Sequence, residues 1–360
     1  MRRFFRLGTA TFILVSLGSV FFSQVSAAPK ILKFATAYEV TNPMTTSMKW
    51  FANELEKRTN NNYKTEVYYS GMIGKPPDLP NLCANGMVDF IFTGAGYTPN
   101  LFRLTRGFEL MYVTENPHAQ DAALWEIYHN YAPIRNEWEK NGLIMGSAMG
   151  CGNMAVQCIN PVNNIDGAKG VKFRSYAAVG KLVHMWGGVP ISISYAEVYE
   201  ALNRGLIKGA FGIPFVNVYD QKWWEVAPYV VDTGIGVYAL TYFAISKRSY
   251  ESFPPDVKTI VDKLREDTNI QHGQWMSNFG KECARKIYHE RKIHLISWTQ
   301  EEKSKAQKMV IPAIWEDWLD EMKKNNLPGE EFLDIYRKSV KRYEKQYPFE
   351  SPYAYIKKLK

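Results

Sequence analysis

The chain has 360 residues, of which 46% are hydrophobic and 22% charged, with a formal net charge of +8. This balance is that of a soluble globular protein, and the length suffices for two domains. Lys and Arg are spread among Asp and Glu except in RKSVKRYEKQ and YIKKLK near the end. That pattern is too diffuse for a nucleic-acid-binding stripe, so no nucleic-acid partner is expected.

The first residues, MRRFFRLGTATFILVSLGSVFFSQVSA, have the order of a secretory signal peptide. Three arginines precede the apolar run 8–22, and the small residues Val25 and Ala27 occupy the positions that a signal peptidase reads. The run is shorter than the ~20 apolar residues of a membrane span. We therefore predict a signal peptide at 1–27, a mature chain beginning at Ala28, and export to the periplasm.

The next segments predict the first α/β lobe. A strand is expected at 31–35 and another at 65–69. The segment 79–92 has the pattern of a short helix, closed by Gly86, followed by a strand. A helix is expected between the first two strands because apolar residues recur at helical spacing, at Met44, Met48, Phe51 and Leu55.

A second set of elements follows the same order. Strands are predicted at 170–174 and 189–193, on either side of a helix with Val179, Leu182, Val183 and Trp186 on one face. Ser194 and Glu197 have the spacing of a capping box, so Glu197 is given a structural role. The helix that follows ends at Gly205, and a strand is expected at 206–211.

Aligning Gly86 with Gly205 superimposes the two helix–glycine–strand units, which indicates two lobes of one design. Beyond Pro255 the chain is predicted to be mostly helical, with helices at 257–267 and about 271–291 and a further capped helix that begins at Thr299.

Alternating strands and helices predict an α/β protein with mainly parallel sheets, two lobes and a hinged cleft between them, as in periplasmic binding proteins. The expected division is 28–150 for lobe one, with 238–268 crossing back to it, and 151–237 for lobe two. Residues 269–360 are expected to form a helical region that packs across both lobes.

The cysteines and histidines match no metal or redox motif. We treat the four cysteines as structural; in an oxidising compartment some could pair, and sequence does not choose among the three connectivities of Cys83, Cys151, Cys158 and Cys283.

The stretch IDGAKGVKFRSYAAVGKLVHMWGGVPISISYAEVYEALNRGLIKGA resembles the central signature of solute-binding proteins of tripartite ATP-independent periplasmic (TRAP) transporters, the DctP-like family. The signature runs from a G-(L/V)-K-x-R strand through a G-x-x-P strand and an E-V-Y-x-A-L helix to a glycine turn. The matching residues are Gly170, Val171, Lys172, Arg174, Gly188, Pro190, Glu197, Val198, Tyr199, Ala201, Leu202, Gly205, Ile207 and Gly209.

The resemblance implies capture of a small organic carboxylate and its delivery to a two-component membrane permease driven by an ion gradient. It assigns the carboxylate to Arg174. A guanidinium at the end of a strand, just before a helix, offers a rigid fork for both carboxylate oxygens. The alternative is a surface arginine held in an ion pair.

The chain departs from the family pattern after this signature. Lys208 stands where the family has Asp, and Phe211 stands in the region where a metal-using subfamily has a ligating glutamate. No metal and no other cofactor is therefore expected. The segment MGCGNMAVQCINP lacks the second arginine of sialic-acid and some dicarboxylate binders, and Asn153 is its nearest polar substitute. We predict a monocarboxylate with an apolar or aromatic body.

Other candidate wall residues follow predicted strands, and each could equally be packing. Of the adjacent Trp223 and Trp224, only one is expected to face inward. The full candidate set is Arg174, Asn153, Phe215, Asn217, Tyr38, Thr93, Tyr97 and Trp223, within loops that include 93–97.

Two other readings stay open. An exported sensor could use the same fold to present a ligand-dependent surface to a partner other than a permease. A secreted hydrolase is the less favoured alternative, because the sequence has no GxSxG elbow and no SxxK with its partner motifs. The main expectation is a binding protein and not an enzyme.

Overall fold

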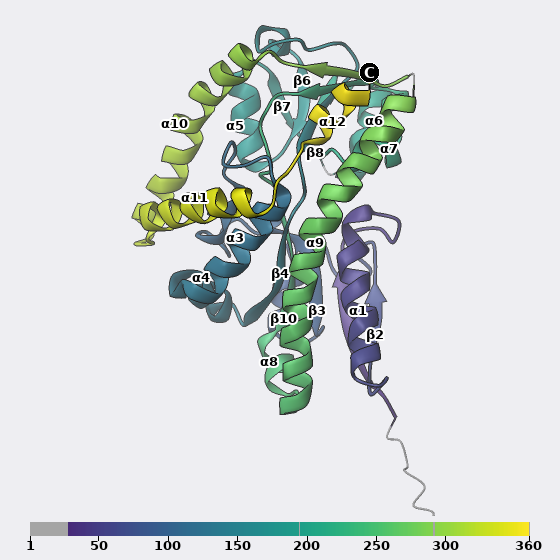
Figure 1. Ribbon diagram of the computed structural model, residues 1–360, viewed down its shortest axis with the longest axis vertical. Coiled ribbons are helices and arrows are strands. Elements are labelled where there is room, and N and C mark those ends of the chain that lie inside the picture. The colour runs from purple at the N-terminus through teal and green to yellow at the C-terminus, as the bar shows by residue number, and fades with distance from the viewer. Residues whose placement is uncertain (1–27, 194, 291, 360) are drawn as a thin grey trace, which may run out of the picture.

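The computed structural model describes residues 28–193, 195–290 and 292–359, and these form two sheets with helices around them (Figure 1). The predicted signal peptide 1–27 lies outside this range. The first sheet has the order β2-β1-β3-β10-β4 and consists of Tyr63–Tyr68, Lys30–Thr36, Phe90–Gly94, Leu240–Ser246 and Leu143–Gly150. The second has the order β11-β9-β5-β8-β6-β7 and consists of His294–Ser297, Tyr229–Asp232, Met154–Cys158, Gly209–Pro214, Lys172–Ser175 and Val189–Ser192.

The chain crosses between the sheets along β4–β5 and returns along β9–β10. In the described residues every antiparallel pairing involves β5 or β10, the strands that arrive from the other lobe, and the remaining pairings are parallel. The two crossings bend at glycines in the left-handed region, Gly152 (φ +74°) and Gly236 (φ +82°). The predicted two-lobed α/β fold is thereby confirmed, with each sheet accepting one reversed strand.

The predicted repeat is present around two equivalent glycines. Gly86 (φ +73°) ends the short helix α2 (Leu79–Ala84), and Gly205 (φ +71°) ends α6 (Val198–Asn203). Each is followed by a central strand, β3 or β8. Strand β8 begins at Gly209, three residues later than the sequence indicated, because the Ile207 amide is still bonded to the Ala201 carbonyl in α6 (3.3 Å), and the first bond to β6 is that of the Lys208 amide to the Lys172 carbonyl (2.8 Å).

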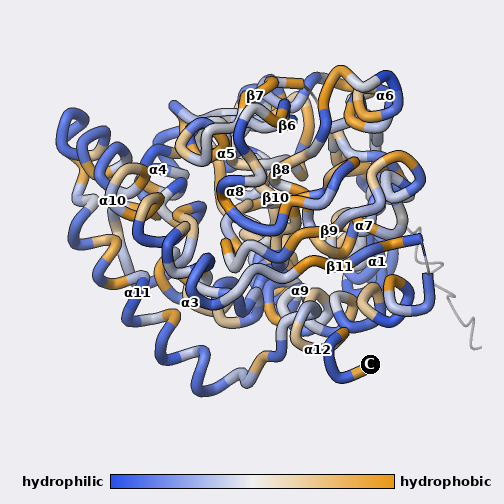
Figure 2. The backbone as a smooth tube through the Cα atoms, turned by 90° about the horizontal axis from the view of Figure 1, so that it is seen from above, coloured by the Kyte–Doolittle hydropathy of each residue, from blue (hydrophilic) through white to orange (hydrophobic). Residues whose placement is uncertain are grey.

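The helices cover the outer faces of both sheets. Besides α2 and α6, the described chain forms α1 Thr46–Arg58, α3 Pro117–Asn130, α4 Ala132–Lys140, α5 Ala177–Met185, α7 Asn217–Asp220 and α8 Lys247–Glu251. The C-terminal part adds α9 Pro255–His289, α10 Gln300–Lys324, α11 Gly329–Gln346 and α12 Pro352–Leu359. Figure 2 shows hydrophobic residues along the central strands, whereas α10 and α11 are largely hydrophilic on their outer sides.

One long helix replaces the two that were predicted between 257 and 291. Helix α9 runs without a break for 35 residues. Its polar stretch stays helical because the Thr268 hydroxyl donates to the Leu264 carbonyl (2.6 Å) and the Asn269 amide donates to the Asp121 carbonyl (3.1 Å). The helix packs against α1 and α3 in lobe one and against α7 and α12 beside lobe two, so it spans both lobes (Figure 1).

The rest of the C-terminal region also connects the lobes. Helix α10 packs against α5 of the second lobe, and α11 packs against α3 of the first. The predicted cap at Thr299 is present, since its hydroxyl accepts from the Glu302 amide (3.2 Å). Strand β11 interrupts the expected helical region and extends the second sheet beside β9. Within the described residues, no helix combines the length and apolarity that a membrane crossing requires.

Cys83, Cys151 and Cys158 are buried free thiols, and Cys283 is also buried, with its thiol donating a hydrogen bond to the Val216 carbonyl (3.4 Å). Burial raises the pKa of Cys151 to about 12, so this thiol is protonated at neutral pH.

Candidate functional site

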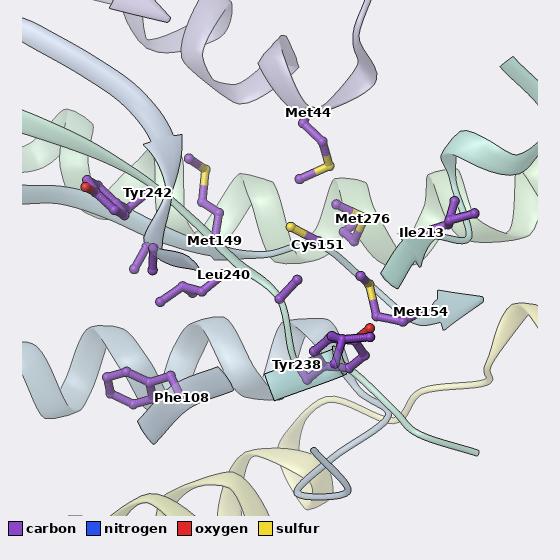
Figure 3. Close-up of a cluster of buried hydrophobic side chains, with 14 of the residues drawn as sticks. Met44, Phe108, Met149, Cys151, Met154, Ile213, Tyr238, Leu240, Tyr242 and Met276 are labelled. Atoms are coloured by element: carbon purple, nitrogen blue, oxygen red, sulfur yellow. The ribbon is translucent and has the colours of Figure 1, made fainter. Parts of the chain in front are cut away.

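A cavity of about 440 Å³ lies between the lobes at the hinge. Its walls come from the ends of β1, β3, β6 and β8 and from the crossing segments near 151–154 and 239–241. Figure 3 shows apolar side chains gathered around the crossing, including Met44 from lobe one and Cys151 and Met154 from the segment that leads into lobe two. Both lobes therefore line one partly open cavity, with strand ends directed toward it.

Arg174 in β6 supplies the positive charge of this cavity. The residue is only 5% exposed, and its guanidinium donates to the carbonyls of Ile193 (3.3 Å) and Phe211 (3.2 Å). No carboxylate forms an ion pair with it in the part of the chain that the structure describes. A buried guanidinium has five N–H donors and is costly without an anionic partner. Arg174 therefore has the properties of an anion-binding residue and not those of a surface ion pair.

Tyrosines from both lobes surround this arginine. Its guanidinium carbon lies 4.9 Å from the ring centre of Tyr176 and 5.8 Å from that of Tyr195. Tyr38 and Tyr97 complete the aromatic wall from lobe one. Burial raises the pKa of all four phenols, so they are neutral at physiological pH and can donate or accept hydrogen bonds without adding charge.

Glu109 places a carboxyl group in the same cavity. It ends the 3-10 helix Thr105–Glu109, and its Oε1 accepts from the Leu240 amide (3.2 Å) on the returning hinge strand. Burial raises the pKa of Glu109 to about 7, and Arg106 partly opposes this effect. Its ionisation is therefore balanced near neutral pH, unlike that of an ordinary surface carboxylate.

Four of the eight candidate residues line the cavity. Arg174 and Asn217 approach from lobe two, and Tyr38 and Tyr97 approach from lobe one. The Asn217 amide donates to the Tyr195 hydroxyl (2.8 Å), which orients that ring toward the arginine. The structure thus brings together residues that are up to about 180 positions apart in the sequence.

The structure places the other four candidates outside the cavity wall. Thr93 is fully buried in β3, because alternation along the strand turns its side chain into the lobe. Asn153 is buried away from this cavity, and its side-chain amide donates a hydrogen bond to the Glu115 carbonyl (3.0 Å). Phe215 packs edge-on against Tyr353, with ring centres 4.9 Å apart.

Trp223 stands one layer behind the wall. It is 3% exposed, and its ring centre is 4.8 Å from that of Tyr195, so it supports a cavity residue. The neighbouring Trp224 is partly exposed and donates to the Tyr219 carbonyl (3.1 Å).

Sequence reasoning missed Tyr176, Tyr195, Glu109 and Met154, which all line the cavity. Tyr176 could have been found, because it follows Arg174 by two residues and strand alternation places both on one side. Glu109 has no such indication: it lies in the irregular segment between β3 and α3, where no periodicity assigns a direction to its side chain.

Phe211, which stands where a metal ligand was considered in the sequence, is buried. Its backbone carbonyl accepts a hydrogen bond from Arg174. In the described ranges no cluster of three His, Cys, Asp or Glu side chains is arranged to hold a metal ion.

A buried serine–histidine–aspartate series lies behind the hinge. Ser47 Oγ is 2.8 Å from His272 Nδ1, and His272 Nε2 is 4.0 Å from Asp121 Oδ2. However, His272 and Asp121 are fully buried, and Nε2 lies closer to the Gly150 carbonyl (3.0 Å). Asp121 accepts from the Gly150 amide (2.7 Å). These hydrogen bonds connect α1, α3 and α9 with one another and with the end of β4. Because the side chains are buried, the serine is not accessible as a nucleophile.

This network predicts a stability change with pH. Burial lowers the pKa of His272 from about 6.5 to about 4. Because the unfolded chain takes up the proton first, the stability due to His272 is complete above about pH 6.5 and is lost as pH falls toward about 4. Between about pH 7.5 and about pH 5, the stability difference between wild type and His272→Gln should shrink by roughly 2 kcal/mol.

Denaturant unfolding at the two pH values measures this change. The same measurement on His294→Gln serves as the control, because His294 is an exposed histidine outside this network. An unchanged difference for His272→Gln would show that this histidine titrates normally in the folded protein.

A two-lobed α/β molecule with a cavity between its lobes has the architecture of solute-binding proteins. Residues 34–321 match the family model of bacterial extracellular solute-binding proteins, family 7 (DctP), and the chain belongs to this family. The resemblance found in the sequence is thereby confirmed.

Relatives of the chain include periplasmic binding proteins. It is 22% identical to the ectoine-binding periplasmic protein TeaA of Halomonas elongata, over 80% of this chain and 84% of that protein. It is 24% identical to the C4-dicarboxylate-binding periplasmic protein DctP of Rhodobacter capsulatus, over 69% of this chain and 74% of that protein. A crystal structure of similar fold is that of a TRAP solute-binding protein from Rhodoferax ferrireducens in complex with copurified benzoate. It superimposes with a TM-score of 0.79 at 22% sequence identity, and the match covers 88% of this chain and 99% of that chain.

Proposed function

We propose that the protein captures a small organic carboxylate in the interlobe cavity and delivers it to a TRAP-type membrane permease. The observation that carries the proposal is Arg174: it is 5% exposed, lines the cavity and has no ion-pair partner in the described chain. A bound carboxylate would satisfy the guanidinium through two parallel hydrogen bonds. Family membership supports binding and delivery as the role, in preference to catalysis.

The walls favour a ligand with one carboxylate and an apolar or aromatic body. Arg174 is the cationic side chain among the lining residues, and around it lie tyrosines, Met44, Met154 and Leu240. A second carboxylate would enter without a second cation to compensate it. The benzoate found in the Rhodoferax ferrireducens protein agrees with a ligand of this class.

Ligand capture is proposed to close the cleft. Tyr97 of lobe one and Tyr195 of lobe two both line the cavity, so a ligand bound there can contact both lobes at once. Such contacts favour the closed state over the open one by their difference in binding free energy. The closed surface is then what the permease recognises, after export to the periplasm and removal of 1–27.

Thermal unfolding of the chain from Ala28, measured with a panel of mono- and dicarboxylates, tests this proposal. A ligand at about 100 times its dissociation constant should add about 2.7 kcal/mol of stability. X-ray scattering of the same samples should show compaction, and mass spectrometry should recover the ligand unchanged. If no carboxylate raises the melting temperature, carboxylate capture is rejected; conversion of the ligand would instead favour the hydrolase.

A further inference from the structure

Glu109 places a carboxyl group in the wall of the cavity in which, by the proposed function, an anion binds. Its Oε1 accepts a hydrogen bond from the Leu240 amide, and Oε2 has no hydrogen-bond donor among the described residues. The group faces the cavity from lobe one, whereas Arg174 faces it from lobe two. Because Glu109 is partly exposed, its Oε2 is open to water or to a hydrogen-bond donor of a ligand.

Tyr176 connects the positions of these two charged groups. Its ring centre is 4.9 Å from the Arg174 guanidinium carbon. The ring also lies near Gly96, where a Cβ would be 3.7 Å from Tyr176 Cε2 and 4.0 Å from Glu109 Oε1. Arg174 and Glu109 therefore both lie near Tyr176. One small molecule placed against the Tyr176 ring can contact both side chains.

Asn217 adds a second unused acceptor in the wall. Its amide nitrogen is bonded to Tyr195, and its Oδ1 is buried without a hydrogen-bond donor. The cavity thus offers acceptors in addition to the donors of Arg174. A simple apolar carboxylate would use the donors and leave the acceptors desolvated, which is unfavourable.

Building on the proposed function, we propose that Glu109 is a second specificity residue, which accepts a hydrogen bond from a hydroxyl or ammonium group carried by the bound carboxylate. The ligand's carboxylate pairs with Arg174, and its donor group lies at the Glu109 end of the cavity. The chemical class is a hydroxy- or amino-carboxylate.

The charge of Glu109 gives this contact a pH dependence. The groups that interact with it electrostatically are Arg106 on its own helix, Tyr242 in β10 of lobe one, Cys151 and Tyr238 in the hinge segments, and Tyr176 in lobe two. Burial raises the pKa of the thiol and of these phenols, so they stay neutral near pH 7. With its pKa raised to about 7, Glu109 is the group whose charge changes there. Above this pH it attracts a donor and repels a plain anion.

Matched ligands test the inference by titration calorimetry on the chain from Ala28. The aromatic series is 3-methylbenzoate, 3-hydroxybenzoate and 3-(aminomethyl)benzoate, and the aliphatic series is pentanoate, 4-hydroxybutanoate and 4-aminobutanoate. At least one series should show a preference of about tenfold or more for a donor-bearing ligand over its methyl analogue. From about pH 6 to about pH 8, affinity for the methyl analogue should fall and affinity for the ammonium ligand should rise. Whichever of the hydroxyl-bearing and ammonium-bearing ligands binds with the higher affinity identifies the donor group that Glu109 recognises.

Two variants assign the preference to Glu109. Glu109→Leu should abolish it, and Glu109→Gln should abolish the pH dependence while keeping part of the preference for a hydroxyl, because an amide oxygen still accepts. Glu66→Gln, which removes an exposed carboxylate of the same lobe, should change neither. Unliganded melting temperatures show whether each variant folds.

The outcomes separate this inference from the proposed function. If methyl and donor-bearing ligands bind equally, or if Glu109→Leu keeps the preference and the pH profile, the role of Glu109 is rejected while carboxylate capture stands. If no carboxylate of either series or of the wider panel binds, both are rejected.

Discussion

Replacing Arg174 by alanine is expected to weaken carboxylate binding by about 100-fold or more, on the order of 3 kcal/mol. The change removes the positive charge of the cavity and leaves the ligand's carboxylate desolvated among tyrosines and methionines. Calorimetry with the best ligand of the panel measures the effect. Arg174→Lys should recover only part of the affinity, because an ammonium keeps the charge but cannot form the two parallel hydrogen bonds of a guanidinium.

Arg204 offers a matched control for this experiment. It lies in the same lobe, and its side chain is 80% exposed beside Glu200 on the surface. Arg204→Ala should leave the affinity within about twofold, since an exposed pair contributes little. Equal affinities for wild type and Arg174→Ala would mean that the anion is held elsewhere.

Replacing Gly236 by alanine is expected to lower the free energy of unfolding by about 3 kcal/mol. Gly236 has φ +82°, and a Cβ there would lie 2.3 Å from the Thr114 carbonyl oxygen. A positive φ costs a residue with a Cβ about 1–2 kcal/mol, and an overpacked contact adds about 1–3 kcal/mol. The neighbouring amide of Val237 is bonded to the same carbonyl (2.8 Å), so the hinge strand cannot move away without losing that bond.

Gly170 separates the two contributions. It has φ +69°, and a Cβ there would meet nothing within 4 Å, so Gly170→Ala should lose only the backbone contribution of about 1–2 kcal/mol. Denaturant unfolding of both variants measures the difference. Equal losses would contradict the close contact at Gly236 and leave backbone strain as the whole effect.

The local features of the fold could be predicted because their causes are local. The apolar spacing from Met44 to Leu55 depends on the helical repeat, and helix α1 follows it. Gly86 and Gly205 end helices because only glycine adopts positive φ without strain. The Thr299 cap likewise depends on residues three positions apart. These causes need no knowledge of the distant chain.

The continuous helix α9 and the added strand β11 could not be predicted in the same way. Asn269 remains helical because it bonds to the Asp121 carbonyl in another helix, and β11 forms because the edge of β9 accepts it. Both outcomes depend on partners that are more than 60 residues away in the sequence. Local propensity carries no information about them.

The sequence by itself determined the family and the two-lobed design, and its 165–210 signature singled out Arg174, which lines the cavity in the structure, as a candidate site residue. Only the tertiary structure decided which other side chains share the cavity. Thr93 and Tyr97 were equal candidates, yet strand pleating buries one and a turn brings the other to the cleft. Glu109 enters because its segment folds back against the Leu240 amide on the hinge strand, 131 residues away. Such a contact is fixed by long-range packing, which sequence periodicity does not encode.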